Sequence, residues 1–209
     1  IADVEEGVEH ALGEQTVMSA RDLCTLPFVD KLLDAGFDAF KIEGRGRNPE
    51  YVRTVVECYR EAMDAWVEGD LGDERKRALT TRLATVFNRG FSEGFYMGRP
   101  IGEFTDRSDN QATLSKEFVG RVTHYYPKAA VARVDVQADG FSCGDELLIQ
   151  GPTTGVLAVA VEEVRQNEVP VARAGRGKAT VPVPEKVRVN DRVYVRRERG
   201  TTEKTPNTA

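Results

Sequence analysis

Three charged residues within a short segment form the first candidate for chemistry in this chain. Lys41, Glu43 and Arg45 alternate with uncharged residues in the segment FKIEGRGR, residues 40–47. If this segment is the end of a β-strand, alternation places Lys41 and Glu43 on one side of it. Opposite charges there could bind an anionic substrate, which makes the three residues the candidate catalytic group. A solvated ion pair in a loop would give the same pattern, so both interpretations stay open.

Cys24 is the cysteine expected near these charged residues, and without partner ligands it is no metal site on the residues alone. It follows a short apolar run at residues 14–19 that is typical of a strand end. Because the carboxyl ends of parallel strands meet at one edge, Cys24 should lie on the same rim as Lys41 and Glu43. Asp22, two residues before Cys24, and Arg47, two residues after Arg45, are the candidate cofactor-binding residues. The simpler alternative for Cys24 is a small buried core side chain, the usual fate of a lone cysteine.

Other familiar catalytic arrangements are missing from the sequence. It has no HExxH zinc motif, no phosphate-binding glycine loop and no recognisable Ser/His/Asp or Cys/His pattern. The cysteines are Cys24, Cys58 and Cys143, an odd number at wide spacings, which argues against a disulfide framework and fits a reducing compartment.

The elements that must position these residues alternate between strand and helix. We predict strands at 14–19 and 37–42, a helix from Pro27 that ends at Gly36, a helix from Asn48-Pro49 to about Val67, and another from about Glu74. This order is typical of parallel βαβ units. Two strands are too few for a complete sheet or barrel, so we expect the C-terminal part of a barrel-like α/β domain, cut from a longer protein.

The long helix shows apolar residues at helical spacing. Its expected inner face is Val52, Val55, Val56, Tyr59, Met63 and Trp66, with the charged residues between them outside.

From about Lys116 the sequence changes to short β-rich runs separated by turn residues. The runs are 118–126, 130–136, 146–150, 156–164, 179–183 and 192–197. This spacing predicts a small all-β barrel. The expected domains are therefore 1–115, which includes a linker, and 116–199, followed by a disordered tail at 200–209.

Charge and hydropathy restrict the setting of the protein. The net charge is −5, but residues 1–115 carry 14 basic and 22 acidic side chains, whereas residues 116–199 carry 14 and 11. The basic second part could face a polyanion such as RNA, although a mixed solvated surface gives the same count. No apolar run approaches the roughly 20 residues of a membrane span, and we expect a cytoplasmic protein.

Several segments together resemble the collagenase-like peptidase family, peptidase U thirty-two. They are SARDLC (19–24), LLDAGFDAFKIEGR (32–45), EYVRTVVECYREAMD (50–64), FNRGFSEGFYMGRP (87–100), FVGRV (118–122), GDELLIQGP (144–152) and NDRVYVRR (190–197). The last three resemble the β-barrel appended to many members. The sequence departs from the family pattern at Arg21, where members often have Lys, and at Gly46-Arg47, where Met-Lys is more usual.

The resemblance implies an absent N-terminal portion and a choice between activities. Members include RNA hydroxylases that act on tRNA wobble uridine or ribosomal RNA cytidine with prephenate, and ubiquinone-hydroxylation proteins whose iron–sulfur cluster is held by four cysteines. Cys24 matches the last of those four, and this resemblance makes it the candidate metal ligand. The leading hypothesis is therefore a prephenate-dependent, iron–sulfur tRNA hydroxylase, and this chain alone should lack the cluster and be inactive. The alternatives are a collagenase-like protease, and a non-catalytic module that binds RNA or protein.

Overall fold

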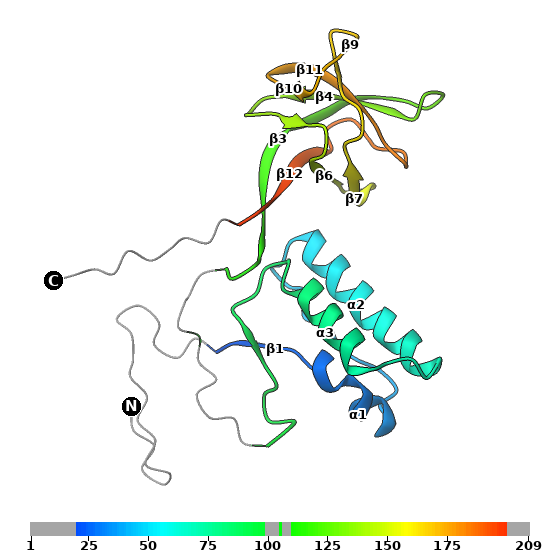
Figure 1. Ribbon diagram of the computed structural model, residues 1–209, viewed down its shortest axis with the longest axis vertical. Coiled ribbons are helices and arrows are strands. Elements are labelled where there is room, and N and C mark those ends of the chain that lie inside the picture. Colours follow the sequence, from blue (N-terminus) through cyan, green and yellow to red (C-terminus); the bar gives the residue numbers. More distant parts are fainter. Residues whose placement is uncertain (1–19, 99–104, 106–109, 200–209) are drawn as a thin grey trace, which may run out of the picture. The chain divides into compact units, whose positions relative to one another are not determined.

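The computed structural model describes residues 20–98, 105 and 110–199, and the chain divides into two compact units, Ile1–Thr113 and Leu114–Ala209 (Figure 1). Each unit is described by itself. The strand predicted at 14–19, half of the predicted linker at 102–115 and the predicted disordered tail lie outside the described residues.

The first unit is mainly helical. Its elements are β1 (Asp22–Leu23), the 3-10 helix η1 (Leu26–Phe28), α1 (Val29–Asp34), α2 (Pro49–Val67), α3 (Asp73–Leu83) and β2 (Phe91–Ser92). The prediction for α2 is confirmed at both ends, because Pro49 occupies the first turn, where its missing N–H costs no hydrogen bond. The two short strands pair in parallel, Asp22 with Phe91 and Leu23 with Ser92. Within the described residues, the parallel sheet of this unit consists of these two strands. The larger α/β barrel stays a prediction.

The prediction of a strand at 37–42 is wrong. In the structure this segment has an irregular backbone and pairs with no strand among the described residues. Alternating apolar residues fit a strand only where a neighbouring strand accepts their backbone hydrogen bonds. The alternation instead turns Phe40 and Ile42 toward the body of the unit, where both are half-buried, while Phe37 is exposed.

The face by which α2 packs agrees with the predicted one only in part, because Val55 is buried and Tyr59 packs against the core but other predicted residues do not. Its fully buried side chains are the small residues Cys58 and Ala62, joined by Val55 and Ala65, whereas Val56 is exposed. Val52 and Trp66, also on the predicted face, are exposed too. Small side chains let α2 lie close to α3 and to the buried residues Leu26 and Val29, so side-chain size as well as hydrophobicity determines the inner face.

The second unit is a small, mostly antiparallel β domain. Its main strands are β3 (Leu114–Tyr126), β4 (Val131–Val136), β6 (Glu146–Gly151), β7 (Gly155–Ala160), β11 (Gly177–Pro182) and β12 (Arg192–Glu198), and each coincides with one of the six predicted runs. The short strands β5 (Phe141–Ser142), β8 (Arg165–Gln166), β9 (Val169–Pro170) and β10 (Arg173–Ala174) complete it. The large sheet has the order β7-β6-β12-β3-β4-β11-β8-β9.

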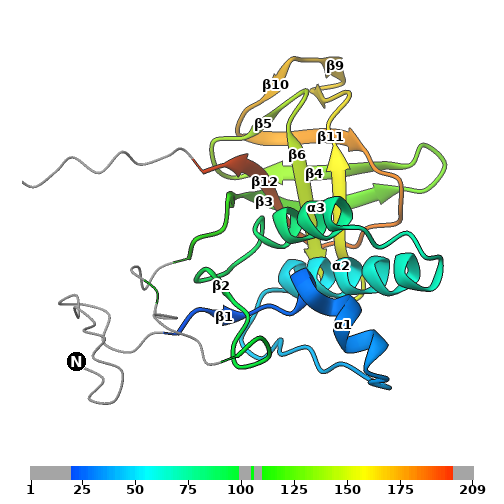
Figure 2. The same cartoon turned by 60° about the horizontal axis from the view of Figure 1, so that its bottom comes forward.

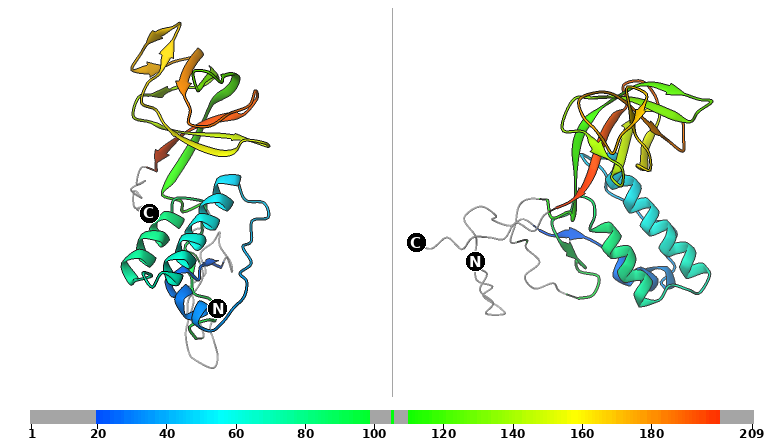
Figure 3. Two further views of the ribbon diagram at one scale, coloured as in Figure 1. Left: turned by 90° about the vertical axis from the view of Figure 1, so that its right-hand side faces the viewer. Right: turned by 45° about the horizontal axis from the view of Figure 1, so that its top comes forward.

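One hydrophobic core lies inside this β unit. All six main strands contribute buried residues to it, and Phe141, Leu147 and Ile149 are the largest fully buried ones. The sheet therefore curls around its own core (Figures 2 and 3). The end strands β7 and β9 are not joined by a ladder in the described part of the chain.

Across the residues that the structure describes, no helix combines the length and the apolar character needed to cross a membrane.

Candidate functional site

A cavity of about 530 Å³ in the first unit collects most of the candidate residues. Its walls come from the chain around β1, the irregular segment after α1, one face of α2 and the residues before β2. Five of the six candidates line it, namely Asp22, Cys24, Lys41, Glu43 and Arg47. The predicted shared rim thus exists as a cavity wall, although a loop and not a strand supplies Lys41 and Glu43.

Arg47 is held in this cavity by two aromatic rings and a carboxylate. Its guanidinium carbon lies 4.2 Å from the centre of the Phe87 ring and 5.2 Å from the centre of the Tyr51 ring. One of its terminal nitrogens donates a hydrogen bond of 3.3 Å to Asp22. Ring faces attract a cation that has lost part of its water, and a planar guanidinium suits such contacts better than an ammonium.

A second arginine contacts the same carboxylate. The backbone N–H of Arg89 donates to Asp22 at 3.0 Å, and its guanidinium donates to the other Asp22 oxygen at 3.0 and 3.3 Å. Asp22 therefore lies between two guanidinium groups at one end of the cavity. Two cations and one carboxylate leave this end positive, which favours a negatively charged ligand.

Cys24 lies deep in the wall and is only 3% exposed. Burial raises the pKa of its thiol, although the Leu26 amide and the Tyr59 hydroxyl act in the opposite direction. Burial likewise raises the pKa of Tyr59 to about 12, with Cys24 adding to the shift. The Tyr59 hydroxyl also accepts a hydrogen bond of 3.0 Å from the Thr25 amide. Both groups are thus neutral near pH 7.

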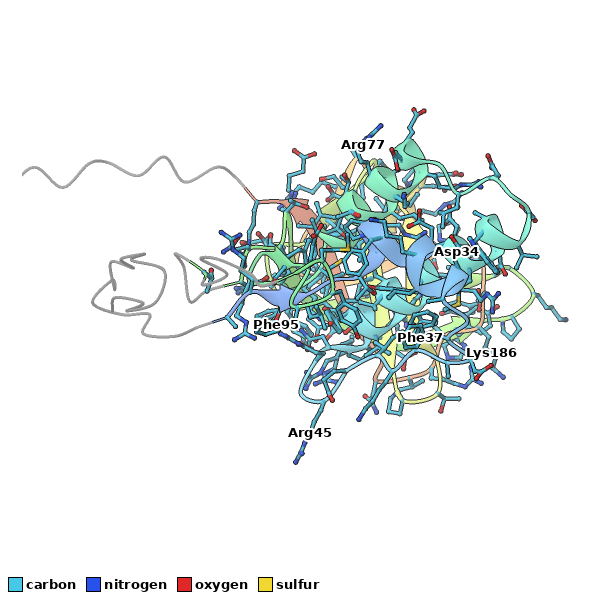
Figure 4. All side chains as sticks on the ribbon, turned by 90° about the horizontal axis from the view of Figure 1, so that it is seen from below. Asp34, Phe37, Arg45, Arg77, Phe95 and Lys186 are labelled. Atoms are coloured by element: carbon cyan, nitrogen blue, oxygen red, sulfur yellow. The ribbon has the colours of Figure 1, made fainter. Side chains whose placement is uncertain are left out.

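The three candidate catalytic residues are not equivalent. Lys41 and Glu43 line the cavity with exposed side chains. Arg45 does not line it, and its side chain extends away from the unit into solvent (Figure 4). The Arg45 backbone N–H donates a 2.6 Å hydrogen bond to the Glu43 carboxylate, which fixes the turn before Gly46. Gly46 adopts φ +71°, a conformation that side chains disfavour.

The aromatic walls of the cavity were missed by sequence reasoning. Tyr51 and Tyr59 lie eight positions apart on α2, with Val55 midway, so helical periodicity places all three on one face. That spacing was the available signal. Phe87 and Arg89 lie in the FNRGF segment, where nothing in the sequence alone indicated that they would meet Arg47 and Asp22.

An iron–sulfur cluster does not fit the described residues by themselves. No group of three His, Cys, Asp or Glu side chains that could hold a metal occurs among them. Cys24 is a single buried thiol whose raised pKa favours the protonated form, whereas a cluster ligand is a thiolate. The geometry that is present suits an organic anion with a planar or apolar body, held by Arg47 and by the rings of Tyr51 and Phe87.

Comparisons with known proteins identify the family of this chain. The model of peptidase family U32 matches residues 2–106. The collagenase of Porphyromonas gingivalis (strain W83) is 43% identical over 93% of this chain and 47% of its own length. The tRNA hydroxylation protein P of Escherichia coli is 26% identical over 91% of this chain and 42% of its own length. The chain spans about half the length of the curated relatives it matches.

Among solved structures, the C-terminal domain of a U32 peptidase of Geobacillus thermoleovorans matches 37% of this chain and 96% of its own length, with 21% identity and a TM-score of 0.35. The family model covers half of the sequence, including all the residues of the cavity described above. The chain belongs to peptidase family U32.

Proposed function

We propose that the protein acts as an RNA-modifying hydroxylase with tRNA as its substrate. The observation that carries this proposal is the cavity in which Arg47 lies between two aromatic rings, beside Arg89 and Lys41. The relatives named tRNA hydroxylation protein, from Escherichia coli and Bacillus subtilis, support an RNA substrate. Modification of tRNA takes place where translation occurs, so the proposed location is the cytoplasm.

The cavity would bind a small carboxylate co-substrate, of which prephenate is the proposed example. A guanidinium offers two parallel N–H donors that match the two oxygens of a carboxylate. Arg47 is positioned for this by Asp22 and by the faces of Tyr51 and Phe87, and Lys41 adds an exposed positive charge to the cavity wall. The rings would contact the apolar body of the same molecule.

In this proposal Glu43 and Asp22 have different tasks. Asp22 is tied to Arg47 and Arg89 and therefore orients them, whereas Glu43 is an exposed carboxylate at the opening. Glu43 is thus the group that could accept a proton from a bound ligand. Iron–sulfur chemistry in the whole protein would need further cysteines beside Cys24, and no step here depends on it.

The proposal is tested by nucleoside mass spectrometry of tRNA from a strain that lacks the full-length gene. We expect a hydroxylated uridine to disappear, to return with the wild-type gene and to stay below about a tenth of its normal amount with an Arg47→Ala gene. The matched control is Arg45→Ala, which should restore the nucleoside because Arg45 lies outside the cavity. An unchanged nucleoside profile in the deletion strain would refute the proposal.

The second candidate is a protease, because the relative named collagenase is more similar to this chain than the tRNA hydroxylation proteins are. The described residues contain no candidate metal centre. His124 is the histidine among the described residues. It lies in the β unit and does not line the cavity. The full-length protein should be incubated with gelatin with and without a chelator. Cleavage that is lost in the Glu43→Gln protein would favour the protease over the hydroxylase.

A further inference from the structure

A bulge in β3 brings aromatic residues to the outside of the β3–β4 hairpin. The pairing of β3 with β4 shifts between Val122 and His124. Val122 is buried and Tyr125 packs against the core, whereas His124 and Tyr126 are exposed. Without the bulge at Thr123, strict alternation along residues 122–126 would turn His124 toward the core. The bulge therefore places two aromatic rings on the same outer surface.

These two rings form a small platform near the end of the hairpin. The ring centres of His124 and Tyr126 are 4.4 Å apart, with an angle of 62° between their planes. Arg133 on β4 donates hydrogen bonds to the Tyr126 hydroxyl at 3.4 Å and to the Thr123 hydroxyl at 3.1 Å. The arginine thus fixes the platform from the neighbouring strand. The hairpin loop projects beyond the rest of the sheet (Figures 1 and 2).

Positive charges surround the platform. Arg121 on β3 and Lys178 on β11 lie in register on either side of Asp135, and Lys128 lies in the hairpin loop. With Arg133 this gives four cations and one carboxylate. Among the described residues, none of the four cations takes part in an ion pair. Within the described part of the chain, Arg121 and Arg133 donate hydrogen bonds only to uncharged groups, so their charge is not neutralised there and can attract phosphates.

We propose that this surface, consisting of His124, Tyr126, Lys128 and Arg133, binds a single-stranded segment of RNA. Bases of a single strand can stack on exposed aromatic rings while its phosphates follow neighbouring cations. A duplex hides its bases and could use the cations alone. The inference rests on the proposed function for the identity of the polymer, and it adds the place and the mode of binding.

Direct binding tests the proposal with the 209-residue chain. A fluorescent 12-nucleotide oligouridine is titrated at several salt concentrations, and its anisotropy gives Kd. We expect His124→Ala with Tyr126→Ala to weaken binding at least tenfold with an unchanged salt slope, because stacking is lost and charge is kept. Lys128→Gln with Arg133→Gln should weaken binding and lower the salt slope by about 0.7 per lost phosphate contact.

Two control variants address other surfaces. Phe118→Ala removes an aromatic residue of β3 that contacts Tyr194 and not the platform, and Lys186→Gln removes a cation outside the hairpin. Both should bind as the wild type does. Far-ultraviolet circular dichroism and melting temperature verify that each variant is folded. Equal weakening by Phe118→Ala, binding of gelatin in place of RNA, or absence of RNA binding by the wild-type chain would overturn the proposal.

The failure of this inference is distinguishable from failure of the proposed function. If the deletion strain loses its hydroxylated uridine but the platform variants bind RNA normally, the surface assignment is wrong and the enzymatic proposal stands. If the deletion strain keeps the nucleoside while the platform variants lose binding, the chain binds RNA through this surface for another purpose.

Discussion

Arg45 and Arg47 lie two residues apart in one sequence pattern, yet the structure gives them opposite surroundings. The side chain of Arg47 is 22% exposed and contacts two rings and a carboxylate, whereas that of Arg45 reaches into solvent. Nothing in the local sequence separates them, because the contacts of Arg47 come from β1, from α2 and from residues before β2. Two residues that are close in sequence therefore differ in their contacts, because the partners of one of them come from distant parts of the sequence.

Alanine substitutions of these two arginines should change the free energy of unfolding by different amounts. We expect Arg47→Ala to lower the free energy of unfolding of the first unit by about 1 to 3 kcal/mol through lost ring and carboxylate contacts. Arg45→Ala should change it by less than about 0.5 kcal/mol, the usual effect at an exposed site. Urea denaturation followed by tryptophan fluorescence measures both values. Equal effects of the two substitutions would contradict the geometry.

The cysteines should differ in reactivity. Cys24 and Cys58 are buried, and burial raises the pKa of both thiols, that of Cys58 to about 11, whereas Cys143 is exposed. Since the thiolate is the nucleophile, Cys143 alone should react rapidly with Ellman's reagent at pH 8 in the native chain. All three should react in denaturant. A Cys143→Ser chain that still reacts rapidly when native would show that Cys24 or Cys58 is accessible.

At the scale of elements, the sequence predicted the helix start and the strand boundaries that local residues determine. It did not predict the features that depend on contacts between distant segments. Asn48-Pro49 was enough to place the start of α2, and turn residues were enough to separate the main β-strands. The face of α2 was predicted only in part, because its inner contacts also use Cys58 and Ala62, which carry a weak periodic signal. The segment 37–42 was mispredicted because alternation does not reveal whether a partner strand is present.

The same distinction applies to the candidate site. Asp22, Cys24, Lys41, Glu43 and Arg47 were predicted from the sequence and share one cavity in the structure. The cavity walls formed by the aromatic rings and by Arg89 were not predicted, because predicting them requires knowing which face of a helix contacts which loop. The charged residues of a site can be guessed from their types, but the rings that hold them depend on tertiary structure.

An ion pair between α3 and α1 should give the first unit a pH-dependent stability. Lys76 donates a 3.0 Å hydrogen bond to Asp30 and also contacts Asp73 at 3.0 Å. Burial alone would raise the pKa of Asp30, but the hydrogen bond and charge of Lys76 outweigh it, so this pKa is lowered. The hydrogen bond to Asp30 raises the pKa of Lys76.

The signs of these shifts define the pH range. The contribution of Asp30 is present above its unfolded-state pKa of about 3.9 and is lost as pH falls through the lower folded value. The contribution of Lys76 is present below about 10.4 and is lost as pH rises through its raised pKa. We expect Asp30→Asn to lower the melting temperature at pH 6 and to have little effect at pH 2. Asp38→Asn, at an exposed site, is the control.

A close contact between β3 and β4 should make one glycine irreplaceable. A Cβ atom on Gly120 would lie 2.0 Å from the Asp135 backbone oxygen, whereas one on Gly175 would meet nothing within 4 Å. We expect Gly120→Ala to destabilise the β unit by at least about 2 kcal/mol, because backbone must move, and Gly175→Ala to be nearly neutral. Guanidinium denaturation followed by circular dichroism measures the difference. Similar midpoints for the two variants would refute this close approach.

At the scale of the whole molecule, the two units have separate hydrophobic cores. The core of the first unit contains Leu26, Val29 and Leu83, and that of the second contains Phe141 and Ile149, with no described residue in common. We expect calorimetry to resolve two unfolding transitions. Arg47→Ala should lower one of them and Gly120→Ala the other, and the double variant should show both shifts unchanged. A single transition lowered by both substitutions would show that the units unfold together.

The separate cores also limit how the sequence can diverge over evolution. A gain in volume at a core position of one unit should be compensated by a loss in the same unit, because no side chain in the described part of the sequence belongs to both cores. Compensating substitutions among relatives should therefore pair positions within 1–113 or within 114–199. The β unit can then acquire new surface residues, and with them new binding preferences, while the cavity of the first unit is inherited unchanged.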